Sequence, residues 1–146
     1  MMKIKLAKQA LDEIRSHAEE DYPNECCGFF FGSEKNFRKM THIKRVKNIQ
    51  SENRKRRFRI DPDEYRRAER FADQHELDFL GIYHSHPEHP AIPSEHDRSV
   101  ALPFFSYIIV SVTGGKSVRV RSWRLNESQQ FDEEELEELP EIEKVS

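Results

Sequence analysis

The chain has 146 residues and a formal net charge of −3. This length suits one domain with its own core, and the slight acidity argues against nucleic acid as a partner. The two cysteines, Cys26 and Cys27, are adjacent, which excludes a disulfide scaffold and fits a reducing compartment. We see no apolar run long enough for a signal peptide or a membrane span, so we expect a cytoplasmic protein without a membrane partner.

The first half of the chain predicts two helices with short strands between them. Leu11, Ile14 and Ala18 share one face of the first helix. The second helix begins after Asp61 as N-cap, with Pro62 at its first position. In chain order we expect a helix at about 8–20, a buried strand at 26–31, strands at 42–49 and 58–60, and the helix from 61 onward.

The second half predicts a strand at 79–83, a short helix from Ser94 to about 101, and strands at 106–112 and 117–125. The last two strands are joined by Thr113-Gly114-Gly115-Lys116, which is typical of a hairpin turn. The Glu-rich remainder, 131–146, predicts an acidic helix or tail beyond a domain formed by 1–130. Together these elements indicate an α/β (α+β) domain with a mixed sheet flanked by helices.

Residues 84–97, HSHPEHPAIPSEHD, carry the clearest chemical signal. His84 and His86 project to the same side of an extended segment because side chains alternate along a strand. Asp97 arrives from the next element as an anionic third ligand. Three protein ligands with an open fourth position form a catalytic zinc site. We therefore predict one Zn²⁺ per chain and hydrolytic chemistry.

Such a centre also needs an oxyanion donor and a general base. Ser94 lies three residues before Asp97 on the same turn, where its hydroxyl can donate to an oxyanion. The base should be a carboxylate near the water but off the metal, and the residues alone leave three open, Glu88, Glu95 and Glu25. Ser with an acid three residues later is also an ordinary helix N-terminus, and the two roles can coexist.

The order Glu25, His84-x-His86, Ser94-x-x-Asp97 resembles that of the JAMM (MPN+) metalloproteases. The resemblance implies Glu25 as the general base, Ser94 as the oxyanion stabiliser, and His84, His86 and Asp97 as zinc ligands. It extends over about 22–109. The flanking segments that are similar to the family's small prokaryotic branch are YPNECCG at 22–28, RFRIDP at 57–62 and GIYHSHP at 81–87.

The same resemblance implies a curved mixed sheet wrapped by helices, related to the cytidine deaminases. It implies hydrolysis of an amide or isopeptide bond at the C-terminus of a ubiquitin-like protein. For a small prokaryotic chain, the implied substrate is a ubiquitin-like sulfur carrier protein ending in Gly-Gly, freed from a cysteine adduct or a C-terminal extension. One position departs from the family pattern, because Cys26 stands where a small Ala is usual. We interpret Cys26 as a small buried hydrophobe.

Two alternatives to a metalloprotease come from other classes. One is a non-catalytic MPN-fold protein-binding module, which the full set of motif residues argues against. The other is a deaminase-like zinc hydrolase, which calls for a Cys-x-x-Cys pair that the adjacent cysteines do not provide.

Three further features have more than one interpretation. His89 and His96 are rival ligands, and we treat both as non-ligands because His96 points about a quarter turn away from Asp97 on a helix. The basic patch Arg54-Lys55-Arg56-Arg57 with Arg59 is either a solvated loop or a docking surface for an acidic partner or its C-terminal carboxylate. The oligomeric state stays open between a monomer and a homodimer.

Overall fold

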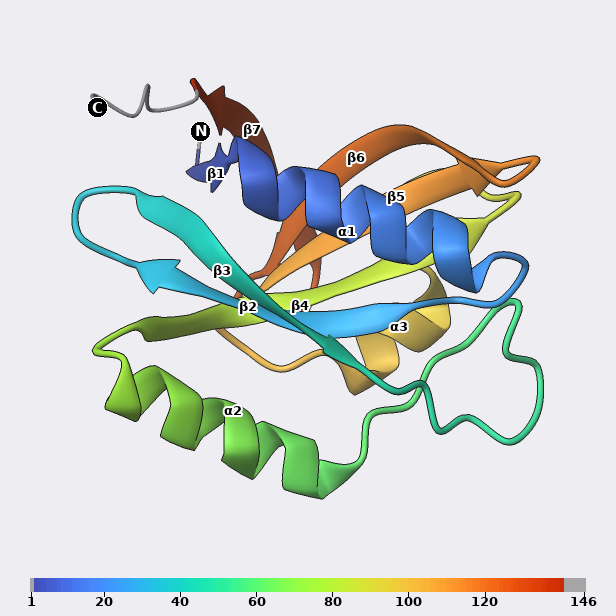
Figure 1. The fold of residues 1–146 in the computed structure, drawn as a ribbon, viewed down its shortest axis with the longest axis horizontal. Coiled ribbons are helices and arrows are strands. Elements are labelled where there is room, and N and C mark those ends of the chain that lie inside the picture. The colour runs from blue at the N-terminus through green and yellow to red at the C-terminus, as the bar shows by residue number, and fades with distance from the viewer. Residues whose placement is uncertain (1, 141–146) are drawn as a thin grey trace, which may run out of the picture.

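The computed structural model describes residues 2–140, which contain seven strands and three helices (Figure 1). The strands are β1 (Lys3–Ala7), β2 (Cys27–Ser33), β3 (Arg38–Val46), β4 (Asp78–Pro87), β5 (Ser106–Thr113), β6 (Lys116–Leu125) and β7 (Phe131–Leu139). The helices are α1 (Lys8–Asp21), α2 (Pro62–Gln74) and α3 (Glu95–Val100). Within this part of the chain no helix is both long and apolar enough to pass through a membrane.

The seven strands form one strongly curved mixed sheet that closes on itself in the order β1-β3-β2-β4-β5-β6-β7. Strand β4 lies in the middle, antiparallel to β2 and parallel to β5. Helix α1 crosses one side of the sheet, while α2 and α3 lie on the other side (Figure 1). The predicted curved mixed sheet with flanking helices is confirmed.

Two hydrophobic cores lie on the two sides of β2, because alternate side chains of a strand point to opposite faces. Phe30 belongs to the core under α1, with Ile14 and Leu80. Phe29 and Phe31 belong to the core under α2. A strand buried on both faces reads as a nearly continuous apolar run, which is why CGFFFG was recognisable in the sequence.

The start of α2 agrees with its prediction. The Asp61 side chain accepts a hydrogen bond from Asp63 N at 2.9 Å, and Pro62 occupies the first turn. The hairpin predicted at 113–116 is also present, between the antiparallel strands β5 and β6.

The prediction of an acidic helix or tail was wrong for 131–139, which form β7. This strand pairs with β6 on one side and with β1 on the other, and it closes the sheet. Its inward side chain is Glu134, 1% exposed, which accepts a hydrogen bond from Ser122 Oγ at 2.8 Å and pairs with Arg124. A buried glutamate breaks the apolar alternation that identifies a strand, so the sequence pattern concealed it. Residues 141–146, the remainder of that prediction, lie outside the described residues.

Two other expectations differ from the structure. The strand predicted at 42–49 runs instead from Arg38 to Val46. Residues 58–60 are not a strand but a loop held beside the segment that follows β3, where Ile49 N donates to Arg59 O at 2.9 Å. Strand β1, which the sequence analysis did not predict, pairs with β3 and β7.

Candidate metal centre

The two histidines of the H-x-H pair lie in β4, the middle strand of the sheet. His84 is opposite Cys27 of β2 and beside Ile109 of β5, so neighbouring strands fix its backbone on both sides. Both histidines are buried, with 1% and 6% of their surface exposed. Their separation by one residue directs both rings to one face, as predicted.

Helix α3 brings Asp97 to the histidines through a reciprocal cap. Ser94 Oγ accepts a hydrogen bond from Asp97 N at 3.0 Å, and Asp97 Oδ2 accepts one from Ser94 N at 2.9 Å. These two bonds satisfy backbone donors at the helix start and hold the Asp97 carboxylate in a buried position. The ordinary helix-cap interpretation of Ser94 is therefore correct, and the cap also positions the candidate ligand.

Three side-chain atoms form a compact triangle, which we call the ligand triangle. His84 Nε2 lies 3.2 Å from His86 Nε2 and 3.3 Å from Asp97 Oδ2, and His86 Nε2 lies 3.0 Å from the same oxygen. Zinc bonds of about 2.0–2.1 Å in a tetrahedron separate neighbouring ligand atoms by about 3.3 Å. The donor set and its spacing thus fit one Zn²⁺ with a fourth position open.

The protonation of both rings suits a metal ligand. His86 Nδ1 lies 2.8 Å from Pro90 O, and because a carbonyl only accepts, Nδ1 carries a hydrogen, which leaves Nε2 as the ring nitrogen for a metal. Burial lowers the pKa of His84, which favours its neutral form. The Phe58 ring stacks on His84 with centroids 4.6 Å apart and fixes its plane.

Asp97 is ionised in this environment. Burial by itself would raise the pKa of Asp97, but the electrostatic interaction and hydrogen bond with His84, together with the hydrogen bonds from His86 and Ser94 N, outweigh it. The pKa of Asp97 therefore lies well below its usual range, and the carboxylate is available as an anionic ligand.

Glu25 borders the same centre from the segment that leads into β2. Its carboxylate and the nitrogens of His84 and His86 lie within 4.8 Å of one another. The residue is 2% exposed, and its Oε1 has no hydrogen-bond partner among the described residues. Burial and the charge of Asp97 raise the pKa of Glu25 to about 9, and a cation at the centre would oppose both effects.

Two carboxylates thus adjoin the histidine pair, and they differ in position. Asp97 completes the ligand triangle, whereas Glu25 leaves an unpartnered oxygen beside it. Glu88 and Glu95, the other candidate bases, are both exposed. Glu88 bonds the Tyr22 hydroxyl at 2.5 Å and Gly114 N at 2.7 Å, and Glu95 pairs with Arg98. Glu25 is the buried candidate of the three.

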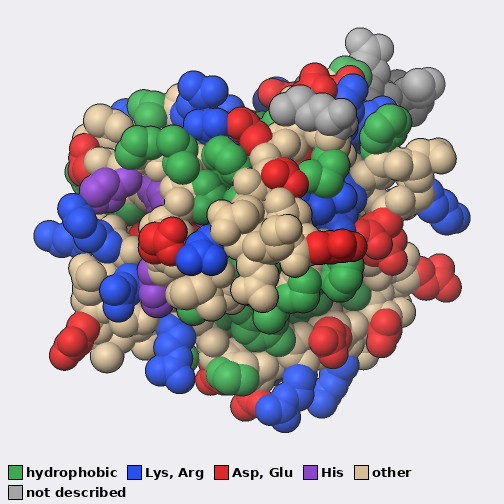
Figure 2. Space-filling view, turned by 180° about the vertical axis from the view of Figure 1, so that it is seen from behind, with side chains coloured by type: hydrophobic (Ala, Val, Ile, Leu, Met, Phe, Trp, Pro, Cys, Tyr) green, Lys and Arg blue, Asp and Glu red, His purple; other side chains and the backbone are tan. Residues whose placement is uncertain are grey.

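The remaining predicted residues lie around the centre. His96 and His89 line hollows beside it, and neither hydrogen-bonds an atom of the ligand triangle in the described part of the chain. Cys26 is fully buried among apolar side chains, as expected. The basic patch is exposed. On the face opposite to that of Figure 1, histidine side chains lie among Lys and Arg side chains (Figure 2).

The sequence analysis did not single out Asn48, which connects Glu25 to the basic loop. Its Nδ2 donates to Glu25 O and to Arg57 O, each at 3.1 Å. Its Oδ1 accepts from Gln50 N and Arg59 N, each at 3.0 Å. The amide thus uses its full bonding capacity, and one Asn in a polar, basic stretch has no sequence pattern that would reveal this.

The geometry agrees with comparisons to known proteins. Residues 7–126 match the family described as prokaryotic homologs of the JAB domain. The chain belongs to this family. It is 36% identical over 117 residues to a desampylase of Haloferax volcanii, covering 77% of this chain and 83% of that protein. It is 31% identical over 111 residues to a CysO-cysteine peptidase of Mycobacterium tuberculosis, covering 75% and 74%.

Solved structures of JAB-family proteins and others share the fold of this chain. A solution structure of a Desulfitobacterium hafniense protein has a TM-score of 0.83, 31% identity and coverage of 97% of both chains. A JAB1/MPN domain protein from Archaeoglobus fulgidus has a TM-score of 0.62 at 20% identity, covering 93% of this chain and 99% of that one, and supports the fold alone. The resemblance to the JAMM metalloproteases is confirmed.

Proposed function

We propose that this chain is a zinc-dependent peptidase or isopeptidase that hydrolyses the amide bond at the C-terminus of a ubiquitin-like sulfur carrier protein. The observation that carries the proposal is the ligand triangle with the buried, unpartnered Glu25 carboxylate beside it. The names of the JAB-family relatives, desampylase and CysO-cysteine peptidase, support this class of substrate.

Each of the five predicted residues has one role in this proposal. His84, His86 and Asp97 would hold Zn²⁺, which acts as a Lewis acid and lowers the pKa of water to about 7. Glu25 takes a proton from the attacking water and passes it to the nitrogen of the leaving amine. The water oxygen then remains on the carrier as a carboxylate, and the C–N bond breaks.

Ser94 stabilises the carbonyl oxygen during this step. Its Oγ already accepts a hydrogen bond from Asp97 N, so the hydroxyl hydrogen is available for donation to an oxyanion. Ser94 is exposed, which lets a substrate carbonyl reach it. A donor of this kind contributes about 2.7–4 kcal/mol to transition-state stabilisation.

The test uses a ubiquitin-like sulfur carrier carrying one residue after its Gly-Gly. The wild-type protein should release that residue, and Glu25→Gln should slow the reaction by about 10²–10⁴-fold, the usual contribution of a general base. Mass spectrometry of the carrier measures both rates. Unchanged cleavage by Glu25→Gln would contradict the role of Glu25, and binding without cleavage by the wild type would favour the binding module instead.

The Gly-Gly ending of the carrier and the oligomeric state belong to the same proposal. Light scattering of the purified protein distinguishes the monomer from the homodimer. The cytoplasmic location remains an expectation, and two buried free thiols, Cys26 and Cys27, agree with a reducing compartment.

A further inference from the structure

Two of the hollows that border the metal centre divide its residues between them. Glu25, His86 and Ser94 line the first, which we call the tail pocket. His84 and Asp97 line the second, which we call the side pocket. Each has a volume of about 260 Å³. A substrate whose scissile bond lies at the centre can therefore extend to both sides of it.

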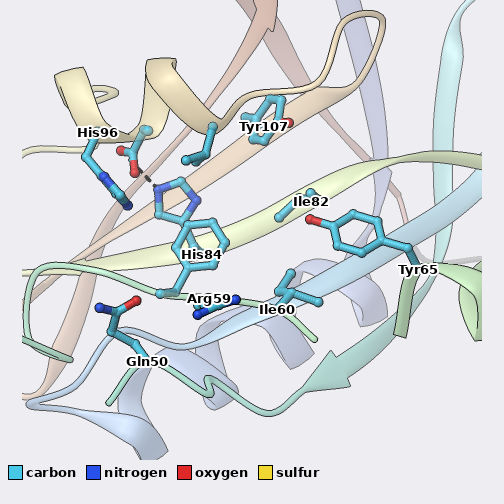
Figure 3. A pocket seen from close by; sticks show the side chains of 11 residues that line it. Gln50, Arg59, Ile60, Tyr65, Ile82, His84, His96 and Tyr107 are labelled. Carbon is cyan, nitrogen blue, oxygen red and sulfur yellow. Dashed lines mark hydrogen bonds and ion pairs between the residues drawn. The ribbon is translucent and has the colours of Figure 1, made fainter. Parts of the chain in front are cut away.

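The side pocket has an apolar wall (Figure 3). Ile82, Tyr107 and Ile60 are 2%, 4% and 6% exposed, so they form a fixed wall. Tyr65 completes this wall, packed against Phe29 with centroids 5.0 Å apart. The volume of the side pocket, about 260 Å³, falls below the range of about 300–1,000 Å³ that is usual for small-molecule sites. A pocket of this size suits one amino-acid residue.

The same pocket carries polar groups that suit a carboxylate. Arg59 lies along it, exposed and without an ion pair among the described residues. The Tyr65 hydroxyl points into the space near Ile82 (Figure 3), and it has no hydrogen-bond partner in the described chain. A guanidinium beside an apolar wall matches a residue with a hydrophobic side chain and a free carboxylate.

We propose that the side pocket binds the residue that leaves, as a single C-terminal amino acid with an apolar side chain, and that Arg59 binds its free carboxylate. This rests on the proposed function. The Gly-Gly end of the carrier has no side chains, so an apolar pocket of side-chain size is suited to the residue on the other side of the scissile bond. The carrier tail then occupies the tail pocket. Hydrolysis adds OH to the carrier carbonyl, and the amine of the released amino acid takes the proton.

The first experiment compares three carriers that end in Gly-Gly-Phe, Gly-Gly-Gly and Gly-Gly-Phe amide. The wild-type protein should cleave the Phe carrier at least about tenfold faster in kcat/KM than the Gly carrier, and the free acid faster than the amide. Equal rates on all three would overturn this inference and leave the proposed function intact. Cleavage of none would contradict the proposed function itself.

Blocking the pocket mouth tests the apolar wall. Val100 lines the pocket and is 52% exposed, so Val100→Trp fills its mouth without disturbing the core. The matched control is Val118→Trp on β6, at a position 59% exposed and outside the pocket lining. The preference for Phe over Gly should fall about tenfold in Val100→Trp alone. An unchanged preference in Val100→Trp would contradict the assignment.

The role of Arg59 is tested by the ratio of rates on the acid and the amide. Arg59→Gln should lower that ratio about fivefold. Arg56→Gln is the matched control, because Arg56 is an exposed arginine of the same loop that lines the tail pocket instead. A ratio within one enzyme is independent of its metal content. Equal effects of the two substitutions would overturn the role of Arg59.

A binding measurement avoids catalysis altogether. N-acetylphenylalanine, added to the metal-free protein, should shift the NMR signals of Ile60 and Ile82 and leave that of Ile92 in the tail pocket unchanged. Shifts confined to Ile92 would place the ligand in the wrong pocket and contradict the proposal.

Discussion

At the scale of single residues, the proposed function gives Ser94 a chemical role beside its structural one. Its oxygen caps α3 by accepting from Asp97 N, and in the proposed reaction its hydrogen would donate to the substrate. The two roles use different atoms of the hydroxyl group, so different substitutions separate them.

Ser94→Gly should retain most of the stability and lose most of the activity. Glycine at an N-cap costs only a few tenths of a kcal/mol relative to serine, whereas alanine costs about 0.5–2 kcal/mol. Both substitutions remove the oxyanion donor and should lower kcat by about 10²–10³-fold. Thermal unfolding and carrier cleavage measure the two effects. Full activity in Ser94→Gly would show that the hydroxyl serves only as a cap.

At the scale of elements, the centre is assembled from β4, α3 and the segment before β2, and a loop braces them. Asn48 makes four hydrogen bonds with its side chain, one to Glu25 O and three to backbone groups of the loop. Glu25 N also donates to Arg54 O at 2.7 Å, so the basic loop holds the Glu25 backbone at both its N–H and its C=O.

Asn48→Asp should distinguish the hydrogen bonds that the Asn48 side chain donates from those that it accepts. Aspartate keeps the acceptor for Gln50 N and Arg59 N but loses both donors, which leaves Glu25 O and Arg57 O without their partner. We expect a loss of about 1–3 kcal/mol in the free energy of unfolding, and a lower kcat with zinc content unchanged. Asn48→Ala should also lose stability, because it removes all four hydrogen bonds, and equal unfolding curves for the wild type and both variants would contradict the brace.

At the scale of the whole molecule, the closed sheet makes β7 part of the domain. It pairs with β1 and β6, so its removal would expose two unpaired strand edges. It would also leave Arg124 without its buried partner Glu134.

A chain that ends at residue 130 should therefore fail to unfold cooperatively. Loss of the closing strand removes the ladder hydrogen bonds to β1 and to β6 and uncovers the side chains that β7 buries. Circular dichroism during heating, compared with the full chain, measures this. A cooperative transition at a temperature close to that of the full chain would contradict this prediction. It would support a domain formed by residues 1–130 alone.

The sequence was informative where one local pattern determines one structure. Three patterns each predict one local structure, and the structure agrees with all of them: the continuous apolar run of β2, the helix start at Asp61-Pro62, and the H-x-H spacing. The sequence pattern was misleading where contacts between residues far apart in the chain determine the structure. Glu134 is buried only because Arg124 and Ser122 meet it across the sheet, and residues 58–60 are held by Asn48 rather than by a strand partner.

The zinc content of the purified protein tests the central claim most directly. Elemental analysis should find about one zinc per chain in the wild type and close to none in His86→Ala, because two of three ligands do not retain the metal. His42→Ala, at an exposed histidine on β3, is the matched control and should keep the wild-type value. A wild-type protein that holds no zinc even after reconstitution would contradict the metal centre and the hydrolase with it.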